Sequence, residues 1–163
     1  MPPVRIDAGH FSPDTRAFIA LLAAQRVRYL IVSGEAVILH GHVRLTGDVD
    51  FSFSADAENR RRLFDALRAF WEGDVPGIAS PDELAPVGVV VQFGQPPNRI
   101  DLVNAIDGVS FEEAWPGRVE AVIAGGGNEV PVTFIGLDAL VQNKRASGWP
   151  KDLDDLSYLD RGS

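Results

Sequence analysis

The chain has 163 residues, 45% of them hydrophobic, which suits one ordinary domain spanning residues 1–163 with a full core. It has no cysteine, which excludes disulfides, thiolate metal sites and a cysteine nucleophile. Fifteen basic residues against 23 acidic ones give a net charge of −8, which disfavours binding to extended nucleic acid, and no apolar run is long enough to span a membrane, so we expect a cytoplasmic protein.

The N-terminal region predicts a helix followed by a buried strand. Ser12 and Pro13 form a helix start, and apolar residues at helical spacing extend the helix to about Arg26. Residues 28–32 (RYLIV) then have the continuous hydrophobic character of a buried strand. This order indicates a fold in which helices and strands alternate.

The segment between Ser33 and Asp56 contains the most informative pattern in the chain. Ser33 and Gly34 break the first strand and open a short helix that Gly41 can end. Residues 48–54 then alternate polar and apolar side chains, the pattern of a strand with one buried face. Asp48 and Asp50 therefore project from the same surface, where paired carboxylates suit a hard divalent cation.

The middle of the chain predicts a long amphipathic helix and two paired strands. Asp56 caps the helix, which carries an apolar stripe, and residues 80–83 begin another short one. Residues 87–93 (VGVVVQF) predict a central strand, and a turn then leads to a partner strand over residues 99–103. Asp101 points away from the apolar residues of that strand and adds a third carboxylate.

The C-terminal region predicts a short helix, a hairpin and two closing helices. Ser110 begins a capping box, residues 118–124 and 130–135 form the hairpin, and helices follow near 137–147 and 151–160. The whole pattern predicts an α/β fold of the mixed α+β kind, with a mixed sheet flanked by helices.

The order of these parts resembles the polymerase-beta-like nucleotidyltransferase superfamily, in its small stand-alone "minimal nucleotidyltransferase" branch. The resemblance extends from about Tyr29 to Leu159. Its motifs are Ser33-Gly34, Arg44-x-Thr46-x-Asp48-x-Asp50, Asp101 within RIDLVNAIDGVSFEEAW, Asn143-Lys144, and Lys151-Asp152-Leu153-x-Asp155-Leu156. It implies a nucleotidyltransferase-like fold and magnesium-dependent chemistry.

The resemblance also implies roles for individual residues. Asp48 and Asp50 would bind two Mg²⁺ ions together with the triphosphate of an NTP such as ATP, and Asp101 would complete one metal site and help to deprotonate the acceptor. Ser33 and Gly34 would hold phosphates, because free amides at a helix start bind anions. Further nucleotide contacts are expected from Arg44, Thr46, Lys144 and Lys151.

Each of these interpretations has a structural alternative. The aspartates of 48–54 could lie on a solvated strand face, and Asp101 could pair with Arg99. Lys144 continues the apolar stripe of its helix, so it either reaches a phosphate or extends past the core. Trp149 is expected to pack, with stacking on a base as the alternative.

The expected reaction is transfer of a nucleoside monophosphate to a hydroxyl of a small molecule, a protein or an RNA end, with release of pyrophosphate. The alternative is a nucleotidyltransferase-like module that binds without catalysis, as one half of a toxin–antitoxin pair. In the family's usual motif the turn begins with glycine, and a left-handed Ser33 would add about 1 kcal/mol of strain. A partner protein or a second copy of the chain could complete the site.

Overall fold

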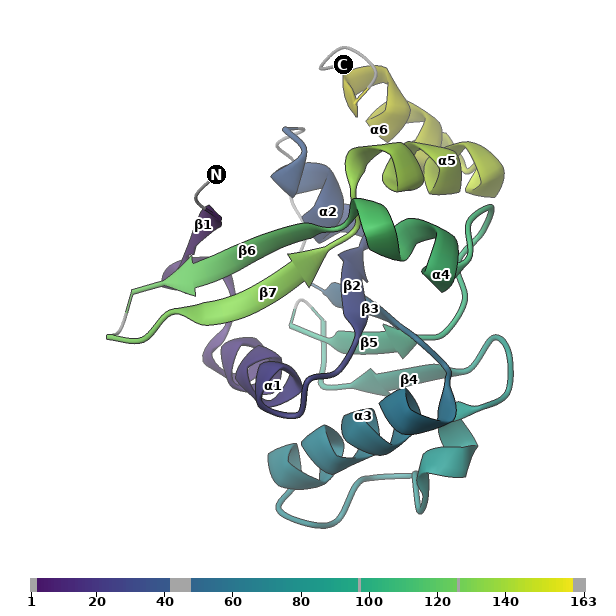
Figure 1. Cartoon of the computed structure of the whole chain (residues 1–163). Coiled ribbons are helices and arrows are strands. Elements are labelled where there is room, and N and C mark those ends of the chain that lie inside the picture. Colours follow the sequence, from purple (N-terminus) through teal and green to yellow (C-terminus); the bar gives the residue numbers. More distant parts are fainter. Residues whose placement is uncertain (1–2, 42–47, 97, 126, 160–163) are drawn as a thin grey trace.

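A mixed seven-stranded sheet organises the chain in the computed structural model, which describes residues 3–41, 48–96, 98–125 and 127–159 (Figure 1). The strand order is β1-β6-β7-β2-β3-β5-β4. The strands are β1 (Val4–Asp7), β2 (Tyr29–Val32), β3 (Val49–Phe53), β4 (Val90–Phe93), β5 (Ile100–Val103), β6 (Val119–Ala124) and β7 (Val130–Phe134). Three neighbouring pairs are parallel, β1–β6, β2–β7 and β3–β5, and the other three are antiparallel. The predicted mixed sheet is confirmed.

The helices occupy both faces of this sheet. The α-helices are α1 (Pro13–Ala24), α2 (Ser33–Leu39), α3 (Ala57–Phe70), α4 (Phe111–Ala114), α5 (Leu137–Ser147) and α6 (Pro150–Leu159). Short 3₁₀ turns are η1 (Ala8–His10), η2 (Pro81–Leu84) and η3 (Trp115–Gly117). None of the helices in the described residues is long and apolar enough to cross a bilayer.

Two hydrophobic clusters hold the three layers together. On one face, α1 and α3 pack on the sheet through residues such as Phe18, Leu67 and Phe51. On the other face, residues of α2, α4, α5 and α6 pack with Leu30 and Val32 (Figure 1). Strand β2 is buried along its whole length, because both of its faces are covered, which explains its continuous apolar sequence.

The local start signals act as the sequence predicted. The Ser12 side chain accepts a hydrogen bond from the Thr15 amide at the start of α1, and Asp56 accepts one from the Asn59 amide at the start of α3. Ser110 and Glu113 complete a capping box at α4. These side chains satisfy amides that the first turn of a helix leaves without partners.

One expectation about the strands is wrong, one strand was not predicted, and one alternative does not hold throughout. Residues 87–93 do not form a central strand: β4 covers only Val90–Phe93 and lies at the edge of the sheet, with Val87 91% exposed. Strand β1, which the sequence did not predict, pairs with β6 at the other edge. The polar side of β3 is not solvated throughout, because Ser52 and Ser54 are buried, and Asp48 lies just before the strand.

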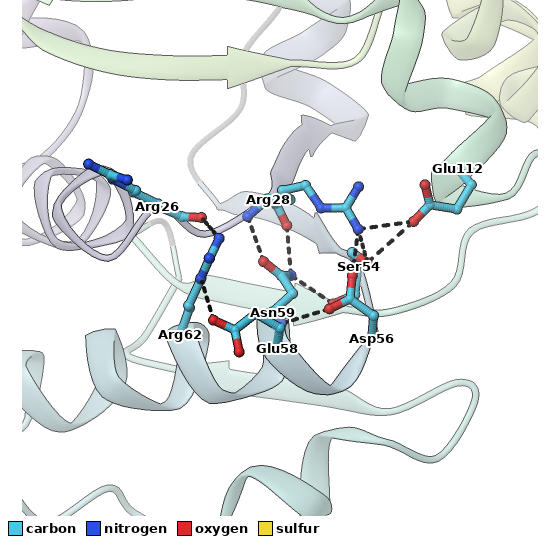
Figure 2. A network of polar contacts seen from close by, with 8 residues as sticks. All are labelled: Arg26, Arg28, Ser54, Asp56, Glu58, Asn59, Arg62 and Glu112. Carbon is cyan, nitrogen blue, oxygen red and sulfur yellow. Dashed lines mark hydrogen bonds and ion pairs between the residues drawn. The ribbon is translucent and has the colours of Figure 1, made fainter.

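A polar network fixes the start of β2 against the end of β3 and the start of α3 (Figure 2). The Asn59 side chain donates to the carbonyl oxygens of Arg28 (3.0 Å) and Ser54 (2.7 Å) and accepts from the Arg28 amide (2.7 Å). The Arg28 guanidinium contacts the carboxylates of Asp56 at 2.5 Å and Glu112 at 3.2 Å. The opposite ends of the same strands, the end of β2 and the start of β3, carry the predicted site residues.

Candidate functional site

Strand β2 runs directly into helix α2, with no loop between them. Strand β2 ends at Val32, and the helix begins at the next residue, Ser33, whose φ of 60° lies in the left-handed region. A side chain there costs about 1–2 kcal/mol relative to glycine, which agrees with the strain expected from the sequence. Gly34 is buried in the first turn of the helix.

Asp50 and Asp101 lie side by side on neighbouring strands. They are direct partners in the parallel register of β3 and β5, and Asp50 is also opposite Val32 across the antiparallel pair β2–β3. Residues in register project from the same face of a sheet, here the face covered by α2 and α5. Ser33 follows Val32 directly, and its side chain is close enough to Asp50 to act on the pKa of that carboxyl, so the structure brings all three predicted residues together.

The electrostatics of this cluster favour a cation. Burial raises the pKa of the Asp50 carboxyl above its ordinary value, although the hydrogen bond from Ser33 acts in the opposite direction. Contact with Asp101 and the negative charge of Asp48 raise the same pKa further. A carboxylate whose pKa is raised by neighbouring negative groups is stabilised in its ionised form by a positive charge placed beside it.

In this structure the positive charge comes from Arg99, as the ion-pair alternative for Asp101 anticipated. The Arg99 guanidinium donates from Nε and Nη2 to the two oxygens of Asp101, at 2.8 and 3.0 Å. Its Nη2 also lies 3.5 Å from Oδ2 of Asp48, whose Oδ1 accepts from the Arg99 amide at 3.1 Å. The hydrogen bonds to Asp101 and the surrounding carboxylate charges raise the pKa of Arg99.

The donor chemistry of the site fits a hard divalent cation such as Mg²⁺, which prefers carboxylate oxygens. In the part of the chain that the structure describes, no three acidic or histidine side chains are gathered into a group that could hold a metal. Arg99 lies between Asp48 and Asp101 and takes both oxygens of the latter. A metal ion would therefore have to replace this guanidinium as the partner of the carboxylates.

Glu35, one residue after Gly34, is directed away from this cluster. It is 5% exposed, and its Oε2 lies 2.5 Å from Nε2 of His10, in a cavity of about 220 Å³ that Ile38 and Phe134 also line. A carboxylate in the first turn of α2 would repel a triphosphate bound there only if it faced the same way. The Glu35 carboxylate instead contacts His10, on the side of α2 that this second cavity occupies.

Lys144 points inward, as its helical spacing predicted, and its amine is held by two carboxylates. It is 3% exposed, with Nζ 2.9 Å from Oδ1 of Asp152 and 3.3 Å from Oδ2 of Asp155. Burial acts to raise the pKa of Asp152, but hydrogen bonds from Lys144 and Ser147 outweigh it and lower that pKa overall. A contact between Lys144 and a phosphate stays a prediction.

A cavity of about 250 Å³ opens beside Ser33, between the start of α2 and the junction of α5 with α6. Asp107, Asn143, Lys144, Trp149 and Asp152 contribute to its walls. Trp149 is 70% exposed, so it does not pack in the core as expected and lines this cavity instead. Lys151 is exposed on α6 and does not line this cavity.

Two of the predicted nucleotide contacts, Arg44 and Thr46, lie outside the described residues, in the segment that precedes Asp48.

Arg99 is a site residue that the sequence suggested only as an alternative partner of Asp101. Its spacing of two from Asp101 was the available signal, because residues i and i+2 on a strand share a face.

The mixed sheet carries a left-handed turn into a helix at the end of β2, and carboxylates on β3 and β5, the next two strands on one side of β2. This arrangement places the protein in the nucleotidyltransferase-like class. The sequence agrees: residues 16–159 match the model of the family described as "Nucleotidyltransferase of unknown function (DUF6036)". The chain belongs to this family, which covers most of its length. No curated protein matches the chain.

Proposed function

We propose that this protein transfers a nucleoside monophosphate from an NTP to a hydroxyl group in a magnesium-dependent reaction that releases pyrophosphate. The observation that carries the proposal is the in-register pairing of Asp50 with Asp101 beside Ser33. The neighbouring carboxylates of Asp50 and Asp101, together with the charge of Asp48, would attract a metal ion, and Asp101 would offer a route for a proton.

The chemistry divides among these residues as follows. Asp48 and Asp50 would hold Mg²⁺ ions, which when bound would neutralise charge on the reacting phosphates. Backbone amides at Ser33 and Gly34 would orient the triphosphate. The acceptor oxygen forms a bond to the α-phosphorus, the bond from that phosphorus to the β-phosphate oxygen breaks, and Asp101 accepts the proton of the attacking hydroxyl.

The cavity beside Ser33 is where we place the nucleoside. The exposed ring of Trp149 offers a stacking surface for a base, and such stacking is worth about 1–3 kcal/mol. The further contacts to the nucleotide that the family resemblance implies would come from Lys144, Lys151, Arg44 and Thr46. The acceptor is a hydroxyl-bearing small molecule, protein side chain or RNA end.

The proposal is tested by measuring pyrophosphate release with Mg²⁺, each NTP and a panel of hydroxyl-bearing acceptors. Asp50→Asn and Asp101→Asn should abolish release, whereas Asp74→Asn, an exposed acid outside the site, should not. The proposal is wrong if the Asp50 and Asp101 variants release pyrophosphate as fast as the unmodified protein.

The ion pair between Arg99 and Asp101 favours a second candidate, a module that binds nucleotide or a partner protein without turnover. A carboxylate whose two oxygens are both hydrogen-bonded to arginine is a poor base. Such a module would fit one half of a toxin–antitoxin pair, or a site completed by a partner chain or a second copy. Nucleotide binding by calorimetry with no pyrophosphate release across the whole panel of acceptors would favour this candidate.

A further inference from the structure

Arg99 occupies the carboxylate cluster with its side chain while its main chain belongs to the sheet. Its carbonyl oxygen accepts from the Val49 amide at 2.9 Å, and its own amide donates to Asp48. The side chain, by contrast, is 30% exposed, and the polar contacts that it makes with other described residues are those of its guanidinium with Asp48 and Asp101. The guanidinium can therefore leave the cluster without disturbing the strand that carries it.

The position of the guanidinium conflicts with that of a metal ion. Both oxygens of Asp101 accept hydrogen bonds from Arg99, and Oδ2 of Asp48 lies 3.5 Å from Nη2. Mg²⁺ would require oxygens of the same carboxylates and would repel a guanidinium that stayed between them. The two cations are alternatives at this place.

We propose that Arg99 competes with the divalent cation for Asp48 and Asp101, and that it transfers to the phosphates of the nucleotide when both ligands bind. This inference rests on the proposed function only in assuming that metal and nucleotide meet at these carboxylates. Arginine suits the exchange, because its planar guanidinium binds phosphate with the same paired hydrogen bonds that it makes to a carboxylate.

The exchange couples the two ligands. Without nucleotide, metal binding must break the contacts of Arg99 and leave its charge beside a second cation. With nucleotide present, the triphosphate offers the guanidinium an equivalent partner, so the cost of metal binding falls. The protein is thus expected to bind metal weakly when alone and more tightly in the presence of an NTP.

The first test measures binding of Mn²⁺, a spectroscopically visible substitute for Mg²⁺, to the full chain without nucleotide. Arg99→Gln removes the competing charge, and Arg61→Gln is the matched control, because Arg61 is an exposed arginine on α3 that is paired with Glu58. We expect Arg99→Gln to bind Mn²⁺ about fivefold more tightly than the unmodified protein, the ratio expected from losing one partly exposed ion pair. Arg61→Gln should bind as the unmodified protein does.

The competition is refuted if Arg99→Gln binds Mn²⁺ no more tightly than Arg61→Gln, or if none of the proteins binds it. A thermal melt by circular dichroism shows whether Arg99→Gln is folded. If it is not, Arg99→Lys serves instead, because lysine keeps the charge but cannot make the paired hydrogen bonds, and it should bind Mn²⁺ more tightly than the unmodified protein.

The second test repeats the titrations with a nonhydrolysable ATP analogue. The analogue should raise the Mn²⁺ affinity of the unmodified protein by a larger factor than that of Arg99→Gln, and equal factors would refute the transfer to phosphate. Tighter metal binding by Arg99→Gln with no pyrophosphate release from any variant would leave this inference standing and reject the catalytic function. Pyrophosphate release by the unmodified protein, with the same Mn²⁺ affinity in Arg99→Gln, would support the catalytic function and reject the competition by Arg99.

Discussion

Replacing Lys144 with alanine is expected to destabilise the fold strongly, because its amine is the cation shared by two interior carboxylates. Lys144 and Asp155 are 3% and 1% exposed, and the amine lies 2.9 Å from Asp152 and 3.3 Å from Asp155. Removing one member of a buried ion pair costs about 3–5 kcal/mol, against about 0–1 kcal/mol for an exposed pair. Since domains unfold with about 5–15 kcal/mol, this loss should lower Tm by about 6–20 °C.

The assay is urea and thermal unfolding followed by circular dichroism. Lys151→Ala is the matched control, because Lys151 is an exposed lysine on the adjoining helix, and it should change the free energy of unfolding by less than about 0.5 kcal/mol. Lys144→Met keeps most of the aliphatic stem and isolates the charge, so it should lose nearly as much stability as Lys144→Ala. If Lys144→Ala melts with the control but no longer binds NTP, the ion-pair account is refuted and Lys144 is a nucleotide ligand.

Three further changes test other parts of the structure. Asn59→Ala removes three hydrogen bonds to the main chain around β2 and β3 and should cost about 2–4 kcal/mol in urea unfolding; a loss below 1 kcal/mol would contradict the network of Figure 2. Ser33→Gly should be about 1–2 kcal/mol more stable than Ser33→Ala, because φ at this position is 60°, and equal thermal melts would argue against the left-handed turn. The lowered pKa of Asp152 means that its stabilisation is complete above about pH 3.9, the unfolded value, and is lost as the pH falls through the folded value. Asp152→Asn should therefore flatten the acid side of a Tm-against-pH profile, and an unchanged profile would show that Lys144 does not stabilise this carboxylate.

Local chemistry explains the elements that the sequence predicted well. Ser12, Asp56 and Ser110 each satisfy amides at the helix start that follows them, and this capping depends on only a few neighbouring residues. The left-handed strain at Ser33 could be anticipated for the same reason. Such features depend on residues that are close in the sequence and not on distant segments.

The errors arose where long-range pairing decides the outcome. The run VGVVV reads the same in the centre of a sheet as at its edge, and only the absence of a further strand beyond β4 in the described residues makes it an edge. Strand β1 has four residues of mixed polarity, so its pairing with β6 leaves no pattern to detect.

In the site, too, local spacing was predictable from the sequence and contacts between distant segments were not. The spacing of two between Arg99 and Asp101 indicated a shared face, and the structure shows that the guanidinium also reaches Asp48. The helical spacing of Lys144 predicted its burial. Its partners could not be predicted, because they lie on the next helix, beyond the left-handed residue Gly148 with φ 66°.

The strand order has a consequence for folding during synthesis. Val4 of β1 pairs with Ala121 of β6, and Ile31 of β2 pairs with Phe134 of β7, so the hairpin β6–β7 is inserted between strands from the beginning of the chain. While the ribosome is still synthesising the first two thirds of the protein, β1 has no neighbour and one side of β2 is open. Until the β6–β7 hairpin is synthesised and pairs with β1 and β2, these unpaired strand edges can pair with strands of other molecules.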